Sequence, residues 1–501
     1  MNEEMSSSEP TSIGRIEGGL DAIVIGATVD GYAAAGTLAS AGFRTVLLEE
    51  EENNQLDNER EFAPGFQYTL GDDTITHIDP GLIDGLDLYR HGLSYTQRRL
   101  KTVYHFDGQE SLSSLPELLD NDSIDEFSSE EDQRRYLTLL ERLSKVARVL
   151  RPMLHNGVVE QGLGPEIDRL ATVSTGSILS DVFSDDRIFL ALLNEAQFGA
   201  EFDASTPYSF LSFVHKLSGE ISGRQGAVGF LEGGGSGLLT PLRRACQAAD
   251  VTFRSANRVK KILVEWDHVA GVELEDGGQL RAPTIVSTVS AKKAFIQHIG
   301  HERVDIELEQ ILSESEKRVV SLGFAVALSN IENAEKFDQG WLKHRHVRGL
   351  SSKKLSAALR DSYRGNVSDN LAVDFVFPSS WDAAEAPVGS AVAKGYLYPV
   401  PAEKTALQKN MESLEQSLGR AISSLSSDLK IEAIDFADFK VTRVGSSSML
   451  RDWQRAQTFF GSPIVDGYFF AGEEARLSRV PDGGVGRRAG QEAVAFLKGI
   501  K

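Results

Sequence analysis

The chain has 501 residues, of which 41% are hydrophobic and 25% charged, and its formal net charge is −21. Its length corresponds to roughly three domain-sized units with enough apolar residues for sizeable cores. The acidic balance argues against nucleic acid and against an anionic membrane surface, because both repel a negative protein. A single cysteine, Cys246, excludes an intrachain disulfide, a CxxC redox pair and a cysteine-rich zinc site. We interpret Cys246 as a small packing residue on a buried helix face.

Residues 1–20 are polar and partly acidic, which predicts a disordered tail. No apolar stretch follows a basic start, so the sequence does not predict a signal peptide. No run of 18 or more apolar residues predicts a transmembrane helix. These features together favour a cytoplasmic protein.

The first ordered elements form a predicted β-α-β unit. A buried strand at 22–26 (AIVIG) precedes a helix of small residues at 31–41, and a second buried strand follows at 45–49 (TVLLE). Short, wholly apolar strands joined by a helix predict a parallel sheet that is covered on both faces.

The turn after the first strand is close to a dinucleotide-binding loop. Gly26 and Gly31 occupy the positions for the tight turn and for close helix–strand packing, and Glu49 ends the second strand where an acidic residue can bind a ribose. Thr28 replaces the middle glycine, and Asp30 lies near a helix N-terminus, where a carboxylate can take an anion's place. The loop by itself leaves two interpretations open: a nucleotide site, or a β-α-β unit that binds nothing here.

Two long amphipathic helices are predicted further along the chain. Leucines and other apolar residues recur at helical spacing over 129–150 and again over 403–425. Ser128 and Glu131 form a candidate capping box at the start of the first of these helices.

Short strands dominate two later segments. The segment 251–288 contains several, separated in part by DH and DGG turns, and 467–471 (GYFFA) is one more buried strand. Glycines and an arginine-bearing helix follow within 483–497.

Other sequence features give only weak evidence for a binding or catalytic site. The glycine-rich 233–237 (GGGSG) is not followed by lysine and is not a P-loop. We interpret His344 and His346 as part of a solvated basic loop rather than a metal site, and His215 as a packed histidine. An aromatic-rich region fits core packing better than an apolar substrate tunnel; it comprises Phe198, Phe202, Tyr208, Phe210 and Phe213.

The segment 226–290 resembles the phytoene desaturase-like FAD oxidoreductases, most closely the branch of the pyridine nucleotide-disulphide oxidoreductase domain proteins. It carries that family's glycine-rich turn, helix, V-x-x-I strand, DG hairpin and exit strand in order. The segments 64–73 and 88–95, and GYFFAGEEA followed by GGVGRRAGQEA, are similar to the same family. The resemblance covers most of the chain, and it implies that 233–237 is a close-packing turn.

The resemblance implies an α/β fold, with an FAD-type Rossmann domain and a second, substrate-type α+β domain. The Rossmann domain is expected to be discontinuous and the substrate-type domain to fill the intervening segments. The expected division is a tail at 1–20, a Rossmann domain at 21–80, 226–300 and 440–501, and a substrate-type domain at 81–225 and 301–439.

The resemblance also implies an FAD site. In the family pattern the backbone of Val259 faces the adenine, Gly472 and Glu473 lie near the ribityl and pyrophosphate groups, and Gly484 and Val485 approach the flavin. The full set of implied cofactor-binding residues is Gly26, Ala27, Gly31, Glu49, Val259, Gly472, Glu473, Gly484 and Val485.

Three departures from the family pattern affect segments that the resemblance places around FAD. They are Thr28, the absence of paired glycines after the acidic strand end, and the unusual residues before the C-terminal glycines. Two functions therefore stay open, and with them the question whether the chain is an enzyme. One is an FAD-dependent, desaturase-like oxidoreductase acting on an apolar small molecule. The other is a flavin-degenerate pseudoenzyme, with FAD weakly bound or lost, that acts as a binding, scaffold or regulatory protein with a protein partner or as a homo-oligomer. No catalytic residue and no metal site is predicted.

Overall fold

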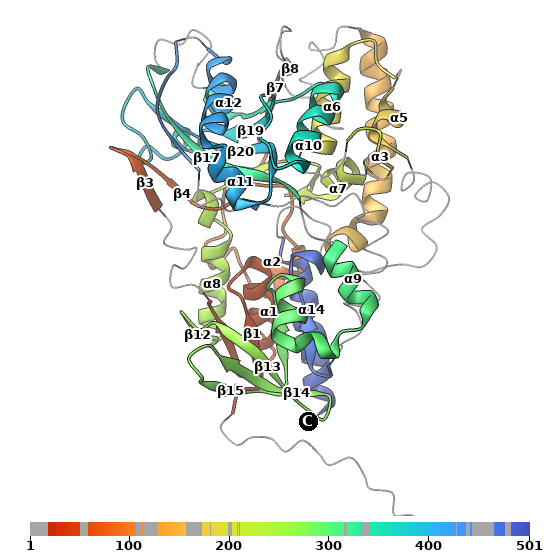
Figure 1. Cartoon of the computed structure of the whole chain (residues 1–501), viewed down its shortest axis with the longest axis vertical. Coiled ribbons are helices and arrows are strands. Elements are labelled where there is room, and N and C mark those ends of the chain that lie inside the picture. Colours follow the sequence, from red (N-terminus) through yellow and green to blue (C-terminus); the bar gives the residue numbers. More distant parts are fainter. Residues whose placement is uncertain are drawn as a thin grey trace, which may run out of the picture.

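The computed structural model of the chain places two structural regions one above the other (Figure 1). The lower region contains the N-terminal β-α-β unit, and the upper region contains a large sheet with helices beside it. The structure describes residues 19–50, 59–106, 112–113, 129–156, 173–180, 182–198, 203–207, 209, 211–314, 318–331, 340–426, 428–436, 441–442, 465–475 and 482–500. The expected tail lies almost wholly outside these residues.

A five-stranded parallel sheet forms the centre of the lower region. In spatial order its strands are β12 (Thr252–Arg254), β2 (Thr45–Leu48), β1 (Ala22–Ile25), β16 (Ile285–Ser287) and β23 (Tyr468–Phe470). Every neighbouring pair is parallel. All residues of β1, β2 and β16 are buried, as in a sheet covered on both faces. The prediction of parallel strands is confirmed, and the sheet draws on three distant parts of the chain. The proposed domain boundaries themselves stay a prediction.

Small residues let the helices of the lower region approach closely. Helix α1 (Val29–Ser40) packs against α8 (Leu239–Ala248) and α14 (Gly484–Gly499). A Cβ atom at Gly486 would lie 2.0 Å from the carbonyl oxygen of Asp30, so the backbones of α1 and α14 are in contact. Glycine is therefore required at this crossing.

The lower region also holds an antiparallel meander and a π-helix. The meander consists of β13 (Val259–Glu265), β14 (His268–Leu274) and β15 (Gln279–Arg281), as the DG turns predicted. The π-helix η3 (Lys292–Gly300) packs against β13 and, through Phe295, against Tyr468 and Phe470 of β23. Helix α9 (Ile306–Glu314) follows it.

An eight-stranded sheet forms the upper region (Figure 1). Its order is β21 (Lys430–Asp435), β17 (Val319–Ser329), β20 (Ala391–Pro401), β19 (Ala372–Val376), β18 (Arg345–Arg348), β7 (Thr102–His105) and β8 (Leu112–Ser113), with β22 (Val441–Thr442) also beside β17. Only the β18–β7 pair is parallel among these described strands. Helix α10 (Ser352–Tyr363) packs against β20 and β17.

The second long amphipathic helix is interrupted, so the prediction of one continuous helix is wrong. The structure has α11 (Lys404–Lys409) and α12 (Met411–Ser423), separated at Asn410. The Asn410 side chain donates to the carbonyl oxygen of Ala406 at 2.7 Å, and the residue ends one helix and begins the next. Asparagine competes for backbone groups in this way, which explains the break within an unbroken apolar stripe.

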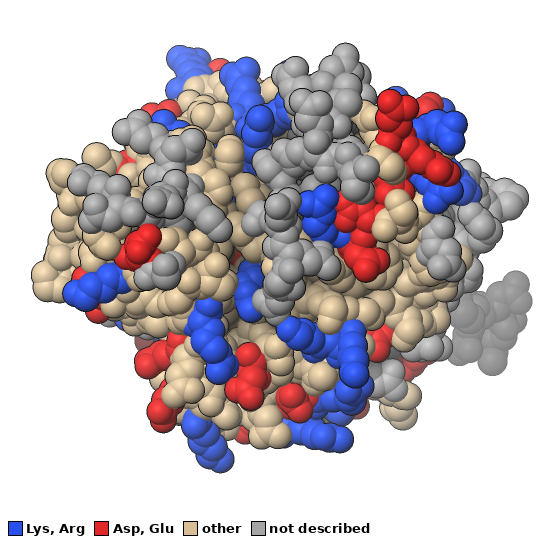
Figure 2. Space-filling model, turned by 90° about the horizontal axis from the view of Figure 1, so that it is seen from above, with Lys and Arg blue, Asp and Glu red and all other residues tan. Residues whose placement is uncertain are grey.

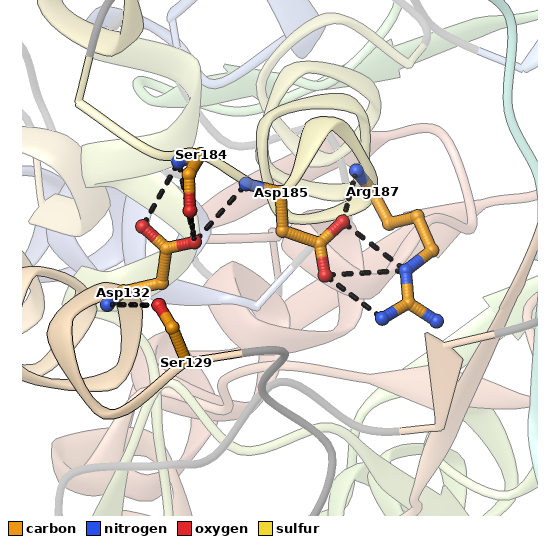
Figure 3. Close-up of polar contacts among 5 residues, drawn as sticks. All are labelled: Ser129, Asp132, Ser184, Asp185 and Arg187. Atoms are coloured by element: carbon orange, nitrogen blue, oxygen red, sulfur yellow. Dashed lines mark hydrogen bonds and ion pairs between the residues drawn. The ribbon is translucent and has the colours of Figure 1, made fainter.

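Four helices pack together beside the sheet: α3 (Glu130–Asn156), α5 (Thr175–Leu179), α6 (Asp186–Gln197) and α7 (Leu211–Ser218). Figure 3 shows how α3 is attached to the start of α6. The carboxylate of Asp132 accepts from the backbone N–H groups of Ser184 at 2.9 Å and Asp185 at 3.0 Å. Burial of Asp132 raises its pKa, but these hydrogen bonds outweigh it and hold the pKa below the usual value. Ser129 caps α3 by accepting from the N–H of Asp132; the predicted capping residue Ser128 lies outside the described residues.

Short elements complete the fold. They are β3 (Glu59–Ala63), β4 (Phe66–Thr69), β5 (Thr74–Ile75), α2 (Pro80–Gly85), β6 (Tyr95–Gln97), β9 (Glu220–Ile221), β10 (Arg224–Gln225) and β11 (Gly229–Leu231). None of the helices within the described ranges has the length and apolar character needed to cross a bilayer. On the face shown in Figure 2, acidic and basic side chains are interspersed.

Candidate functional site

The turn between β1 and α1 needs glycine at two positions for steric reasons. Gly26 has φ +103°, and a Cβ atom there would lie 2.5 Å from the hydroxyl of Thr288. A Cβ atom at Gly31 would lie 1.9 Å from the carbonyl oxygen of Gly26. The two glycines thus close the turn and set α1 directly against the end of the sheet, as a dinucleotide loop requires.

Thr28 caps helix α1. Its backbone is extended, with φ −95° and ψ 171°, so this position does not need the conformational freedom of glycine. The Thr28 hydroxyl accepts from the N–H of Gly31 at 3.1 Å and donates to Thr288 at 3.1 Å, and Thr288 donates to the carbonyl oxygen of Ile25 at 3.0 Å. The polar end of Thr28 is therefore directed into the protein, and it contributes to the turn's stability.

Two buried carboxylates bind the N-terminal turn of α14. Asp30 lies in the first turn of α1, but its Oδ1 accepts from the N–H of Gly486 at 3.1 Å. Asp482 accepts from the N–H of Gly484 at 2.9 Å. Both carboxylates are at most 3% exposed. The N-terminal end of α14 carries a partial positive charge that favours a bound anion, and these two carboxylates supply negative charge at that end.

Glu49 lies at the end of β2 and is 2% exposed. Its Oε1 accepts from Arg243 at 2.9 Å and from the hydroxyl of Tyr32 at 3.3 Å, and its Oε2 accepts from Ser255 at 2.5 Å. Burial, and then the charge of Glu49, raise the pKa of the Tyr32 phenol above its normal range. The carboxylate is thus fixed by three donors from α1, α8 and the segment after β12.

The remaining predicted residues lie around the same end of the sheet. Val259 begins β13 and is buried, close to where the carbonyl of Glu49 accepts from the N–H of Asn257 at 3.2 Å. A Cβ atom at Gly472 would lie 2.3 Å from the carbonyl of Val289. Glu473 begins the 3-10 turn η9 (Glu473–Ala475), and its side chain lies outside the described set.

The structure therefore brings together most of the predicted positions. Gly26, Ala27 and Gly31 form one turn. Glu49 is connected to this turn by its hydrogen bond with Tyr32 of α1. Helix α14, which begins with Gly484 and Val485, is connected to it by a hydrogen bond with Asp30 of α1. Their roles toward a cofactor stay predictions. Sequence reasoning missed the residues that complete the arrangement: Tyr32, Arg243, Ser255, Thr288 and Asp482.

A second buried charged cluster lies in the upper region and was not predicted. Glu195 of α6 accepts from Arg345 of β18 at 2.7 Å and from the hydroxyl of Tyr104 at 2.6 Å, and it forms an ion pair with Lys216 of α7. Arg345 also binds Asp374 of β19 at 2.5 Å. Burial lowers the pKa of Lys216 to about 8, although Glu195 opposes this. The cluster joins the helices to the sheet.

His346 corrects the prediction of a solvated basic loop. It is fully buried on β18, where it stacks on Phe375. Its Nε2 lies 3.1 Å from the carbonyl of Trp341, and its Nδ1 lies 3.1 Å from Nε2 of His105. Burial, and then His105, lower the pKa of His346 well below its normal value, so the ring is neutral. Because a carbonyl only accepts, Nε2 of His346 carries the proton and His105 donates to Nδ1. Nowhere in the described ranges do three potential metal ligands cluster.

Three other interpretations are confirmed. Cys246 is fully buried in α8, its thiol donates to the carbonyl of Tyr32 at 3.2 Å, and burial raises its pKa to about 12. The glycine-rich turn is a close-packing one, since a Cβ atom at Gly235 would lie 2.1 Å from the carbonyl of Leu70. His215 is buried on α7, as expected for a packed histidine.

Comparison with known proteins supports a single class. No protein-family model matches the chain. The mouse protein named pyridine nucleotide-disulfide oxidoreductase domain-containing protein 2 is 23% identical over 437 residues, covering 77% of this chain and 75% of that protein. Phytoene desaturase of Cercospora nicotianae is 24% identical over 300 residues, covering 55% of this chain and 46% of that enzyme.

Solved structures show the same architecture. An oxidoreductase from Methanosarcina mazei superposes with a TM-score of 0.61 at 16% identity, over 94% of this chain and 100% of that one. Putrescine oxidase bound to putrescine superposes with a TM-score of 0.61 at 13% identity, over 95% of this chain and 99% of that one. The predicted fold class, an FAD-type Rossmann domain with a second α+β domain, is confirmed. The resemblance stated from the sequence is confirmed as well, since the curated relatives carry the names of that family and branch.

Proposed function

We propose that the chain is an FAD-dependent, desaturase-like oxidoreductase that acts on an apolar small molecule. The observation that carries this proposal is the turn after β1, where backbone contacts demand glycine at positions 26 and 31, with Glu49 at the end of the neighbouring strand. In a doubly wound sheet, nucleotides bind at the carboxyl ends of the strands. The names of the curated relatives and the fold of the oxidoreductases support the same class.

The residues present fit FAD in part. The turn at 26–31 presents backbone toward a pyrophosphate, and the buried Glu49 and the backbone of Val259 would hold the ribose and the adenine. Bound flavin supplies hydride acceptance, so this chain's own residues need only bind, orient and exclude water. An apolar substrate requires no charged partner, and hydride transfer requires no protein nucleophile, which agrees with the lack of a predicted catalytic set.

The test is the absorption spectrum of the purified full-length chain, before and after titration with FAD. The proposal expects flavin absorbance bands and saturable, one-to-one uptake. A colourless protein that remains colourless in excess FAD would contradict it. With flavin bound, anaerobic bleaching by candidate apolar substrates then reports the reduction step.

The alternative, a flavin-degenerate binding, scaffold or regulatory protein, is favoured by one specific observation. Asp30 and Asp482 occupy N–H groups at the start of α14, and three donors already bind Glu49. A carboxylate about 4 Å from a phosphate costs roughly 1–4 kcal/mol, depending on screening.

The two functions make different predictions for Asp30. Asp30→Asn keeps an oxygen that can accept from Gly486 but removes the charge, so FAD uptake should improve if the charge is the obstacle. Thr28→Gly should not improve uptake, because the Thr28 hydroxyl is directed into the protein. Tight uptake by the unmodified chain would reject the alternative. We include in the proposal a cytoplasmic location and a homo-oligomer or protein partner. Light scattering of the purified protein tests the homo-oligomer.

A further inference from the structure

The loop between β19 and β20 is attached to the hairpin of β3 and β4. After the 3-10 turn η7 (Pro378–Ser380), residues 382–387 follow as turns and bends rather than as a helix or strand. The backbone N–H of Gln67, on β4, donates to the carbonyl oxygen of Glu385 at 2.9 Å. The side-chain amide of Gln67 donates to the carbonyl oxygen of Ala384 at 3.1 Å. Two hydrogen bonds from one residue of β4 thus hold this loop.

The side chain of Glu385 lies beside a buried ion pair. Glu385 is half-buried, its Oε2 is fully covered, and the charges of Asp73 and Lys394 both act on it. Nζ of Lys394, on β20, lies 2.8 Å from Oδ1 of Asp73 and also donates to the carbonyl oxygen of Thr69. The lysine is therefore already paired, and Oε2 of Glu385 has no hydrogen-bond partner within the described residues.

Asp73 connects this ion pair to the glycine-rich turn that precedes α8. Its carboxylate accepts from the backbone N–H of Gly235. A Cβ atom at Gly234 would lie 2.8 Å from Oδ1 of Asp73, so the turn packs directly against the carboxylate. A charge on Glu385 therefore acts where the upper sheet, through Lys394, meets a turn that leads into the lower region.

The surroundings of Glu385 disfavour its ionised form. Burial, and then the charge of Asp73, raise the pKa of Glu385 to about 8, and Lys394 opposes this shift. The charges of Asp382 and Glu59 add smaller repulsions. The carboxyl group of Glu385 is therefore neutral at pH 7 and below, and it becomes negative as the pH rises through the range in which enzymes are commonly assayed.

Other charged groups on the neighbouring elements have partners of their own. Arg60 of β3 pairs with Asp435 at 3.0 Å. Glu61 of β3 accepts from a backbone N–H of the hairpin turn at 3.0 Å. Asp72 accepts from the hydroxyl of Tyr396 on β20. These contacts are made without Glu385.

Ionisation of Glu385 favours a different position of the loop. In the attached loop the carboxylate would be partly buried beside Asp73 with no donor for Oε2, which is unfavourable. In solvent the carboxylate is hydrated and its pKa returns to the usual value of 4.5. The carbonyl oxygen of the same residue accepts from Gln67, so an outward movement of Glu385 breaks one of the two hydrogen bonds that hold the loop.

We propose that Glu385 is a pH-sensitive latch for the loop at 382–387. The neutral carboxyl group keeps the loop on β4, and the ionised group releases it. As the pH rises, the released loop loses its proton first, so release increases between about pH 4.5 and about pH 8 and levels off above that range. The latch belongs to the chain itself and operates whether or not FAD binds.

The test is hydrogen–deuterium exchange of the full-length chain at about pH 6.5 and about pH 8.5, read by mass spectrometry in peptides that contain Gln67 and Glu385. Glu385→Gln stays neutral and is measured at the same two pH values, so that the intrinsic pH dependence of exchange cancels. Relative to this variant, exchange of the unmodified chain should rise about tenfold between the two pH values. Glu415→Gln, at an exposed position of α12, is the matched control and should keep the full rise.

A second variant separates the latch from simple packing. Asp73→Asn removes the nearest repulsion and leaves Lys394 free to pair with an ionised Glu385, so the loop should stay attached at about pH 8.5. A purely structural Asp73 would instead give faster exchange at both pH values. Should this variant fail to fold, Asp382→Asn removes a smaller repulsion and should lower exchange at the higher pH.

The proposal makes a definite claim about the unmodified chain. Exchange that has the same ratio to that of Glu385→Gln at both pH values would overturn the latch. So would a pH-dependent rise that persists unchanged in Asp73→Asn or, where that variant does not fold, in Asp382→Asn. A colourless chain that takes up no FAD but shows the rise would reject the proposed function and leave the latch in place.

Discussion

Two buried glutamates, one in each region, show how differently the same side chain is used. Glu49 and Glu195 are both at most 4% exposed at the side chain, and each accepts from one arginine and one tyrosine. Glu195 also pairs with Lys216, and its arginine is shared with Asp374. Glu49 instead has Ser255 as its third donor.

The surroundings of the two arginines separate the clusters. Arg345, beside Glu195, is 9% exposed, whereas Arg243, beside Glu49, is 24% exposed and lies over the ring of Phe253. The upper cluster is therefore closed and balanced in charge, which suits a structural joint between helices and sheet. The lower cluster lies at the ends of the strands, and its arginine is partly exposed to solvent.

The largest expected effect is for Arg345→Met. It leaves Glu195 and Asp374 without their shared cation, and breaking a buried ion pair costs about 3–5 kcal/mol. Urea denaturation should show this loss of unfolding free energy. The control Arg360→Met, on an exposed position of α10, should change stability by less than about 0.5 kcal/mol. A loss at Arg345 no greater than at Arg360 would mean that the upper cluster is not a structural joint.

Arg243→Met should cost less, about 1–3 kcal/mol, because Glu49 keeps Tyr32 and Ser255 and the arginine is partly solvated. The neighbouring Arg244→Met, which changes an exposed residue of the same helix, is the control. If Arg243→Met destabilises as strongly as Arg345→Met, the proposed difference between the clusters disappears. The same denaturation experiment measures both variants.

The pH dependence of the unfolding free energy should show the contribution of Glu195 in the upper cluster. Burial alone would raise the pKa of Glu195, but Arg345 and Lys216 hold it far below its usual value. As the pH falls, Glu195 therefore binds a proton in the unfolded chain before it does so in the folded chain. The stabilisation that the ionised Glu195 contributes is present above about pH 4.5 and is lost as the pH falls further. Between pH 4.5 and 3, Glu195→Gln should show a pH slope of the unfolding free energy that is smaller by up to about 1.4 kcal/mol per pH unit. Parallel curves would contradict the pairing.

The smallest effect is expected at the helix cap of the lower region. Thr28→Ala removes the hydroxyl that accepts from Gly31 and should cost about 1 kcal/mol, read as a shift in the thermal midpoint. Thr28→Ser keeps this oxygen and should stay near the unmodified protein. A Thr28→Ala variant as stable as Thr28→Ser would show that the cap contributes nothing.

Sequence patterns located the lower site because its main markers are local. Gly26, Gly31 and Glu49 lie within one β-α-β unit, whose strand and helix periods fix their relative positions. The partners of Glu49 were missed because Arg243 and Ser255 lie 194 and 206 positions further along the chain, with no local pattern to mark them. His346 was misread because one charged tetrapeptide looks solvated until neighbouring strands cover it.

The amino-acid sequence by itself determined the parallel strands and the glycine-dependent turn, since these depend on short-range periodicity and steric need, and it carries the resemblance to proteins named as oxidoreductases and phytoene desaturase. Only the tertiary structure decided the direction of Thr28, the partner of Asp30 and the burial of His346. Hydrogen bonding and burial depend on which distant segments come into contact, and long-range packing alone sets those contacts.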